Sequence, residues 1–485
     1  MACEFHNLLL ILAGCLLGTL VGVLPGLGPV GAISILLPLT FQLPPAGAII
    51  MLAGIYNGAM YGGSTTSILI NVPGEAASVV TCLDGYAMAK RGQAGAALGI
   101  AVFGSFIAGT VGLIGLQFVA GPLSALALKF GPPEYFAVIL LGFTFIVYLA
   151  ERSMVKAVLM ALMGITLSLI GLDPITSQQR MTFGNIHLFE GLSVVPLAIG
   201  LFGLAEVLAN LEKTASAKIL NVKIRNMFPS KSQWLQARWA IVRGTVIGFF
   251  MGILPGGGPV LSTFISYGVE KRVSKHPEQF GQGAIEGVAA PESANNAAAS
   301  TSFIPLMTLG IPPNVVLAVL FGAFLIHGVT PGPMMMTQHP EIFWGVIASM
   351  YLGNVILLIL NLPLIPLWVQ VLRIPDKILY PLIILFCLLG AFSINNSVFD
   401  IGVMILFGGI GYLLKKFDYE AAPLILGFVL GPMFEVNLRR SLLMSQGSLG
   451  IFAERPMALT ALIICGILVI LPAAKMIYSR KMISR

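Results

Sequence analysis

The stretch GILPGGGPV, Gly252 to Val260, ends a long apolar run and decides how the rest of the chain is interpreted. Prolines and glycines at this density would unravel a transmembrane helix, so other groups must satisfy the backbone that the break releases. A near-copy, GVLPGLGPV, occupies Gly22 to Val30, 230 residues earlier, and seven of its nine residues are identical. A duplicated helix break of this kind indicates the central site of a transporter.

The duplication extends upstream as two glycine series with the same spacing, Gly14, Gly18 and Gly22 in one copy and Gly244, Gly248 and Gly252 in the other. Glycines four residues apart are typical of closely packed membrane helices, and we interpret the first series in that way. The GLGP and GGGP breaks differ from these series, because close packing would not require duplicated prolines. We therefore favour a binding site at the breaks over packing alone.

Composition indicates the class of protein. Of the 485 residues, 57% are hydrophobic and only 10% are charged, and the mean hydropathy is +0.93, which excludes a soluble globular protein. Apolar stretches of about 20 residues recur along the chain. They predict an all-α polytopic membrane protein in the lipid bilayer, with about 11 or 12 transmembrane helices. The net charge of +7 comes with basic residues in short loops, as membrane topology requires, and does not indicate nucleic-acid binding.

The basic residues also divide the chain. We predict an N-terminal membrane repeat (1–212), a basic cytoplasmic linker with an interfacial helix (213–243), and a C-terminal membrane repeat (244–485). A lipid head-group site is the alternative role for the linker. If the linker is cytoplasmic and the first helix enters from outside, the two repeats are inverted. Basic residues near the end of the chain place the C-terminus in the cytoplasm: Lys475, Arg480, Lys481 and Arg485.

Each break is followed by a segment rich in serine, threonine and asparagine. The first is NGAMYGGSTTSILINVPG, Asn57 to Gly74, and the second runs from Ala284 to Asn314. Small residues alone would serve helix packing, but this concentration of hydroxyl and amide groups favours two re-entrant hairpins that line a cavity. In the second segment Ser300, Thr301 and Ser302 correspond to Ser64, Thr65 and Thr66 of the first.

A helix broken at Pro-Gly exposes N–H groups and a positive dipole end, which bind a carboxylate without any lysine or arginine. Four such breaks, at Pro25, Pro73, Pro255 and Pro312, could surround one polyanion. The predicted substrate-binding residues are these four prolines with Gly26, Gly28, Gly256, Gly257, Gly258, Asn57, Gly63, Ser64, Thr65, Asn295, Asn296, Ser300 and Thr301. Unwound carbonyls and hydroxyls also suit a sodium ion, and the predicted coupling-ion residues are Thr66, Asn71, Ser302 and Glu292.

Charged residues near the breaks have alternative interpretations. Glu292, with Glu286 nearby, is either a proton carrier or cation ligand inside the membrane, or a loop residue that caps a hairpin helix near Asn295. His327 receives no role. Glu435 and Arg439 have the spacing of an ion pair on one helix face, which we interpret as structural or gating.

The stretch LDPITSQQR, Leu172 to Arg180, is expected to be an exposed turn without a catalytic pattern. Signatures of soluble enzymes and of nucleotide binding are absent from the chain, so coupling should come from an ion gradient, either sodium or proton, and no cofactor is expected.

Four separated motifs carry a resemblance to a known family: the two breaks, YGGSTTSILINVPG, APESANNAAA, and the run from Pro423 to Phe452. Together they resemble the large membrane subunit of the tripartite tricarboxylate transporters (TctA-type), over nearly the whole chain. The resemblance implies a secondary transporter of the bacterial inner membrane that imports citrate-like or related carboxylates, with sodium coupling in the family's namesake case. It also implies two partners, a small membrane subunit with four helices and a periplasmic solute-binding protein.

The chain departs from the family pattern at two places within the predicted site. Ser300-Thr301 replaces a glycine pair, and Pro313 replaces a glycine. These departures affect the identity of the substrate more than the family. Two other classes of function compete with a transporter, namely a passive channel, which needs no soluble donor, and an intramembrane enzyme, for which a nucleophile and base are lacking.

Overall fold

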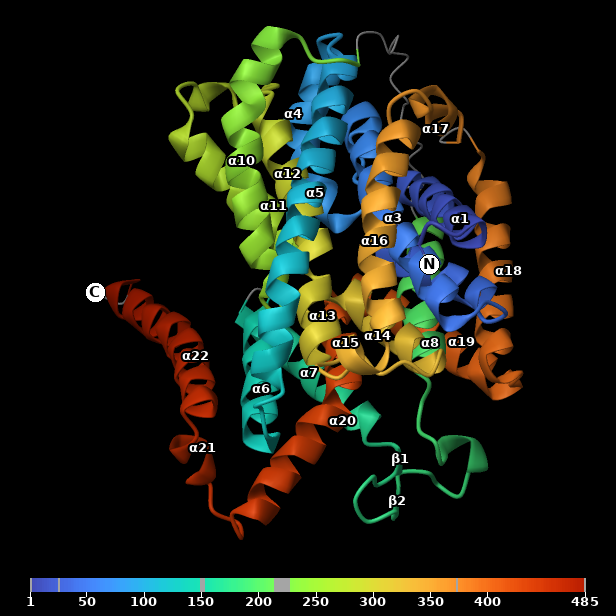
Figure 1. Cartoon of the computed structure of the whole chain (residues 1–485), viewed down its shortest axis with the longest axis vertical. Coiled ribbons are helices and arrows are strands. Elements are labelled where there is room, and N and C mark those ends of the chain that lie inside the picture. Colours follow the sequence, from blue (N-terminus) through green and yellow to red (C-terminus); the bar gives the residue numbers. More distant parts are fainter. Residues whose placement is uncertain (1, 25–26, 149–152, 213–226, 372–373, 484–485) are drawn as a thin grey trace. The chain divides into compact units, whose positions relative to one another are not determined.

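The structure is a computed structural model that describes residues 2–24, 27–148, 153–212, 227–371 and 374–483, without the side chains of 376 and 471–483. The described residues are mostly helical, with two strands of two residues each (Figure 1). Among them, seven helices are long and apolar enough to cross a membrane, and five shorter apolar helices accompany these. The predicted all-α polytopic membrane architecture is thereby confirmed. The number of crossings, the re-entrant hairpins and the inverted repeats stay predictions.

Parts of several predictions lie outside the described residues. Pro25 and Gly26 of the first break, the linker segment 213–226, and Arg485 at the C-terminus belong to this group. The side chains of Lys475, Arg480 and Lys481 are likewise not described, so the cytoplasmic C-terminus stays a prediction.

The chain forms two compact units, and each draws on both halves of the sequence. The first unit comprises Met1–Ser124 and Val195–Lys416, and the second comprises Ala125–Val194 and Phe417–Arg485. These units are defined by contacts, whereas the predicted boundaries at 212 and 243 describe a sequence repeat. The two kinds of division are different. The predicted division into two repeats and a linker is not tested by the compact units and stays a prediction.

The first unit contains most of the helices. Its first part consists of α1 (Phe5–Val23), α2 (Gly28–Leu36), η1 (Leu37–Thr40), α3 (Pro45–Ile70), η2 (Ala76–Ser78), α4 (Val79–Lys90) and most of α5 (Ala94–Ala127). Its second part consists of most of α8 (Val194–Ala198), η4 (Ile199–Leu204), α9 (Ala205–Leu211), α10 (Lys231–Ile253), α11 (Gly258–Val273), η5 (Pro277–Gln279), α12 (Glu286–Thr301), α13 (Phe303–Leu309), α14 (Val315–Ile326), α15 (Met335–Gln338), α16 (Pro340–Leu360), α17 (Ile365–Val371), α18 (Asp376–Asn395) and α19 (Val398–Lys416).

Glycines set the closest helix packing in the first unit. On α1, a Cβ atom at Gly14, Gly18 or Gly22 would overlap the carbonyl oxygen of a residue on α3, respectively Met51, Ile55 and Ala59. Any side chain at these glycines would push α3 away, so the two backbones lie in direct contact. The interpretation of this glycine series as a packing surface is confirmed.

The second glycine series packs in the same manner against α12. A Cβ atom at Gly244, Gly248 or Gly252 of α10 would overlap the carbonyl oxygen of a residue on α12, respectively Ala290, Ala294 and Ala298. Both pairs of contacts advance by four residues on each helix. The packing of α1 on α3 is therefore matched by the packing of α10 on α12.

The helices end where local chemistry requires it. Asn71 terminates α3 with φ 59°, and Gly310 terminates α13 with φ 70°, both in the left-handed conformation that glycine and asparagine tolerate best. A proline follows two residues later in each case, Pro73 and Pro312, and prevents the helix from continuing. Ser230 starts α10 by accepting a hydrogen bond from the backbone N–H of Gln233.

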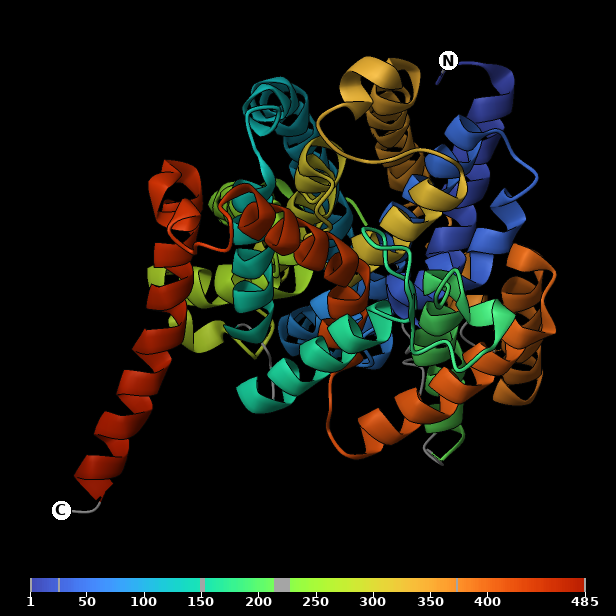
Figure 2. The ribbon, with the colours of Figure 1, turned by 90° about the horizontal axis from the view of Figure 1, so that it is seen from below.

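The second unit is smaller. It contains α6 (Pro132–Tyr148), α7 (Met154–Ser168), β1 (Gly171–Leu172), β2 (Gln179–Arg180), η3 (Ile186–Leu188), α20 (Ala421–Met444), α21 (Ile451–Glu454) and α22 (Pro456–Ile483). The two strands pair in an antiparallel hairpin. Figure 2 shows α7, in teal, beside α20, in red, and glycines again allow the approach, because a Cβ atom at Gly164 would overlap the carbonyl oxygen of Leu424.

Candidate functional site

A buried carboxylate connects the two halves of the first unit. Glu292 of α12 is 1% exposed and accepts two hydrogen bonds, from Ser64 Oγ of α3 at 2.6 Å and from Thr81 Oγ1 of α4 at 2.5 Å. Hydrogen bonds to a carboxylate are stronger than those between neutral groups. The Ser/Thr-rich first segment and the PESANN motif of the second therefore meet at one point.

The position of Glu292 bears on one of its two interpretations. It lies in the middle of α12, which begins at Glu286, and not in a loop. The alternative that Glu292 is a loop residue capping a hairpin helix near Asn295 is therefore wrong, because its carboxylate bonds to α3 and α4 rather than to a helix N-terminus. Glu286 is the residue in the first turn, where it accepts hydrogen bonds from Gln236 at the surface.

Glu75 is a second buried carboxylate, and the sequence analysis missed it. It is 6% exposed, accepts the backbone N–H of Ala77 at 3.0 Å and starts the short helix η2. Its other oxygen accepts a hydrogen bond from Asn295 Nδ2 of α12 at 3.1 Å. One signal could have revealed it: Glu75 is the first charged residue after the charge-free run from Phe5 to Gly74.

Both breaks lead into helices without a side-chain cap. The helix α2 begins at Gly28 with φ 58°, and α11 begins at Gly258 with φ 59°. At neither helix start does a backbone N–H donate to a side chain of the preceding residue, Leu27 or Gly257. Positive φ at both places requires glycine, which explains why the two copies retain it. Uncapped helix N-termini are suitable sites for anions.

The amides at the second break are partly in use. Gly256 N–H donates to the carbonyl of Pro313 at 2.7 Å, and Gly257 N–H donates to the carbonyl of Leu254 at 3.0 Å. These two amides are therefore satisfied within the protein. The donors that remain for an anion are those of the first turn of α11.

The other predicted substrate-binding residues lie on two helices, in the second break, and just after the ends of two helices. Asn57, Gly63, Ser64 and Thr65 are on α3, Asn295, Asn296, Ser300 and Thr301 are on α12, Pro255 is in the second break, and Pro73 and Pro312 follow the ends of α3 and α13. Asn296 Nδ2 donates to Ser105 Oγ of α5 at 2.7 Å, and Thr301 donates to the carbonyl of Ala297 in its own helix. The structure thus brings α3, α5 and α12 together around polar groups.

The four predicted coupling-ion residues do not bond to one another in the described part of the chain. Thr66 donates to the carbonyl of Gly63, Ser302 accepts from Asn314, and Asn71 is the exposed residue at the end of α3. Only Glu292 joins the buried polar groups described above.

Asp84 of α4 is a third buried carboxylate, and its side chain is not exposed to solvent. One of its oxygens accepts three backbone N–H groups, those of Gly281, Gly283 and Ala284, at 2.7–2.9 Å. Its other oxygen accepts the hydroxyl of Tyr267 at 2.9 Å. Asp84 therefore fastens the loop before α12 to α4. The sequence gives no sign of this role for Asp84, because its partners lie about 200 residues away.

The second unit holds a network of four charges. Arg439 Nη1 contacts Glu435 at 3.1 Å on α20, which confirms the predicted ion pair, and it also contacts Asp173 at 2.8 Å. Arg180 of the β-hairpin contacts both acids. The predicted exposed turn is correct for residues 174–179 but wrong for Asp173, which is buried because the two arginines surround it.

Hydrogen bonds also set the charge state of this aspartate. Burial alone would raise the pKa of Asp173, but the backbone N–H groups of Ile175 and Thr176 and the guanidinium of Arg439 hold that pKa well below its ordinary value. Asp173 therefore stays ionised in the hairpin, and its hydrogen bonds to two backbone N–H groups hold the turn that follows it.

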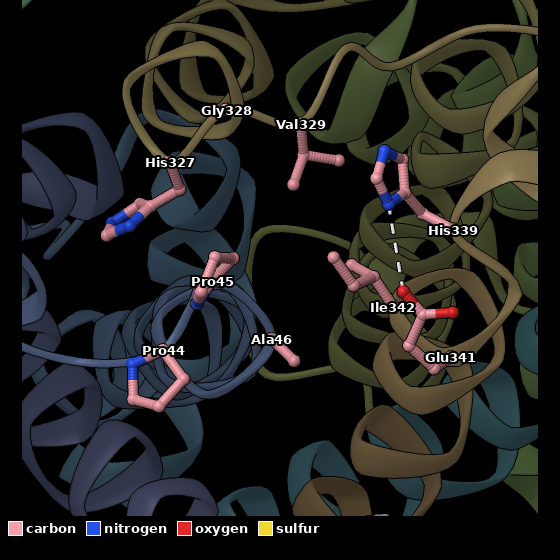
Figure 3. A pocket seen from close by; sticks show the side chains of 9 residues that line it. All are labelled: Pro44, Pro45, Ala46, His327, Gly328, Val329, His339, Glu341 and Ile342. Atoms are coloured by element: carbon pink, nitrogen blue, oxygen red, sulfur yellow. Dashed lines mark ion pairs between the residues drawn. The ribbon is translucent and has the colours of Figure 1, made fainter.

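An open pocket of about 320 Å³ lies near the start of α3 (Figure 3). It is lined mainly by apolar atoms, with His327, His339 and Glu341 as its ionisable residues. His339 Nδ1 lies 3.7 Å from Glu341, and His327 Nε2 lies 3.1 Å from Thr40 Oγ1. None of the predicted site residues lines it, so this pocket is separate from the polar groups around Glu292.

Comparisons with known proteins agree in pointing to one group of proteins. The sequence model of the family described as "Tripartite tricarboxylate transporter TctA family" matches residues 8–426. An uncharacterised 52.8 kDa protein in the TAR-I ttuC' 3' region of Agrobacterium vitis is 50% identical over 472 residues, which cover 97% of this chain and 94% of that protein. An uncharacterised protein in the TAR-II ttuC' 3' region of the same organism is 54% identical over 231 residues, covering 47% of this chain and 96% of that protein. No solved structure matches the chain significantly.

Proposed function

Because the chain belongs to the TctA family of tripartite tricarboxylate transporters, we propose that it is the large membrane subunit of a binding-protein-dependent secondary transporter that imports carboxylates. The transporter resides in the bacterial inner membrane with its C-terminus in the cytoplasm. Its partners are a small membrane subunit with about four helices and a periplasmic solute-binding protein that delivers the substrate. The seven long apolar helices support the membrane part of this proposal.

One observation carries the assignment of the substrate class. The two glycine breaks begin α2 and α11 at Gly28 and Gly258, and neither helix start has a side-chain cap. A helix N-terminus offers backbone N–H donors and a positive dipole end, which suits a carboxylate. Two such ends can hold two carboxylate groups of one organic acid. The chemical class of the cargo is therefore a di- or tricarboxylate.

An ion gradient drives the import. Glu292 is buried and has no ion-pair partner among the described residues, so its charge requires a proton or a sodium ion when the site is closed to water. Sequence analysis found no nucleotide-binding motif that would provide another source of energy. These two points and the transporter family support secondary active transport as the proposed mechanism.

The departures from the family pattern concern the identity of the substrate. Pro313 provides the carbonyl that accepts the Gly256 amide, so it shapes the second break directly. Ser300-Thr301 lies on α12 beside α10, where the Thr301 hydroxyl contacts the position of Gly252. Because these residues differ from the family pattern, the substrate is expected to be related to citrate but different in shape.

Uptake into membrane vesicles tests the proposal. The chain is reconstituted with its purified small subunit and binding protein, and uptake of labelled di- and tricarboxylates is measured under a sodium gradient, a proton gradient, or neither. We expect saturable uptake that requires the binding protein and collapses without the gradient. Equilibration without any gradient, or conduction without the binding protein, would instead identify a passive channel.

A further inference from the structure

Glu75 and Glu292 are two of the buried carboxylates of the first unit that lack a basic partner among the described residues. Glu75 and Glu292 are 6% and 1% exposed, and neither takes part in an ion pair among the residues that the structure describes. Their hydrogen bonds come from hydroxyl, amide and backbone donors. An ionised carboxylate without a positive partner is expensive to bury, so a cation should accompany at least one of them.

Asn295 identifies which of the two carboxylates is the better candidate. Its Nδ2 donates to Glu75, so the amide group is directed toward that carboxylate, yet its Oδ1 has no hydrogen-bond partner among the residues that the structure describes. Asn295 is 1% exposed, and a buried carbonyl oxygen without a partner costs about 1–3 kcal/mol. An unsatisfied oxygen next to an unpaired carboxylate is the arrangement that a hard cation would complete.

In the second half of the unit, the residue that corresponds to Glu75 is uncharged. A Cβ atom at Gly28 would lie 3.9 Å from Glu75 Cβ, and a Cβ atom at Gly258 would lie 3.3 Å from Asn314 Cβ. Glu75 and Asn314 both cap the helical turn that follows. Asn314, however, is uncharged, and its amide is satisfied by Ser302 and by the backbone of Leu317. Only the first of these two places carries a negative charge.

We propose that Glu75 and Asn295 bind one sodium ion between the two halves of the first unit. Both ligands are oxygen atoms, as hard cations prefer, and the single carboxylate matches a single positive charge. Glu75 comes from the first half and Asn295 from the second, so the ion bridges the elements that carry the two breaks. The inference rests on the proposed transport function only in assigning this ion as the one that drives import.

Binding of ²²Na⁺ to the purified full-length chain in lipid nanodiscs tests this site directly. The wild-type chain should bind sodium saturably, with displacement by unlabelled sodium and not by potassium. Glu75→Gln removes the charge and should weaken binding about tenfold or more, while Asn295→Ala removes one neutral ligand and should have a smaller effect. Glu286→Gln is the matched control, because it makes the same change at a half-buried carboxylate of α12 that bonds to Gln236 and should bind like the wild type.

Size-exclusion profiles and thermal unfolding confirm that each variant is folded, and Glu75→Asp replaces Glu75→Gln if the latter does not fold. Sodium binding that is unchanged in a folded Glu75 variant would overturn the proposal. So would an absence of saturable sodium binding in the wild type, including the case in which only proton uptake by Glu75 is detected. Because no substrate or partner enters this assay, its result is independent of the uptake experiment. Sodium binding without carboxylate uptake would refute the proposed function and leave the ion site standing.

Discussion

At the scale of single residues, the buried acids of the first unit are held by donors from distant parts of the chain. Glu292 receives hydroxyls from α3 and α4, Glu75 receives an amide from α12, and Asp84 receives backbone groups from the loop before α12. Sequence analysis selected Glu292 because it lies in a polar motif near a break. It missed Glu75 and Asp84, because no local pattern reveals partners about 200 residues away.

Asp84 provides the first prediction at this scale. The substitution Asp84→Ala removes a buried acceptor that serves three backbone N–H groups and one hydroxyl, of which the Ala284 N–H is buried and the others are partly exposed. A buried donor left unpaired costs about 1–3 kcal/mol, so we expect a fall in the thermal unfolding temperature of the purified protein.

Asp84→Asn is the matched control for that prediction, because it keeps one acceptor oxygen and should lose less stability than the alanine variant. Equal stability of the wild type and the alanine variant would show that Asp84 does not fasten the loop to α4.

Asp173 gives a prediction about pH. Its pKa is lower in the folded hairpin than in the unfolded chain, where it is about 3.9, so ionised Asp173 stabilises the hairpin at neutral pH. This stabilisation is complete above the unfolded pKa and is lost as the pH falls below it. We expect hydrogen exchange in residues 171–191, corrected for intrinsic rates, to become faster as the pH is lowered from about 5 to below 4.

The variant Asp173→Asn should show fast exchange at both pH values and so lose most of this pH dependence. Glu190→Gln, a change at an exposed carboxylate of the same loop, should behave like the wild type. A pH profile shared by all three proteins would exclude Asp173 as its source.

At the scale of elements, glycines spaced by four residues determine which helices touch. The series on α1 and α10 faces backbone carbonyls of α3 and α12 with no space for a side chain. The sequence identified the spacing, and membrane helices use such spacing for close packing. It could not identify the partner helix, because contact depends on how the chain folds back through intervening helices.

A pair of variants tests this packing. Gly248→Leu places a side chain against the carbonyl of Ala294 and should cost about 3 kcal/mol or more, observed as a lower thermal unfolding temperature and less folded protein. Gly268→Leu is the control, because nothing lies within 4 Å of a Cβ atom there. Similar stability of the two variants would contradict direct backbone contact between α10 and α12.

At the scale of the whole molecule, the two compact units cut across the order of the sequence. The first unit takes most of both predicted repeats, including both breaks, and the second combines α6 and α7 with α20 and α22. The central polar groups thus belong to one unit, and the network of Asp173, Arg180, Glu435 and Arg439 belongs to the other. The sequence repeat gave no indication of this division, because it relates segments by similarity and not by contact.

The sequence by itself determined the class of protein, the helical architecture, the family and the position of the glycine breaks. These follow from hydropathy, residue spacing and motifs, which act locally along the chain. Only the tertiary structure decided that Glu292 lies inside a helix, that Glu75 shares its surroundings with Asn295, and that the second-break amides of Gly256 and Gly257 are already satisfied. The physical reason is that a buried charge or amide is explained by its partners in space, and those partners here are far away in sequence.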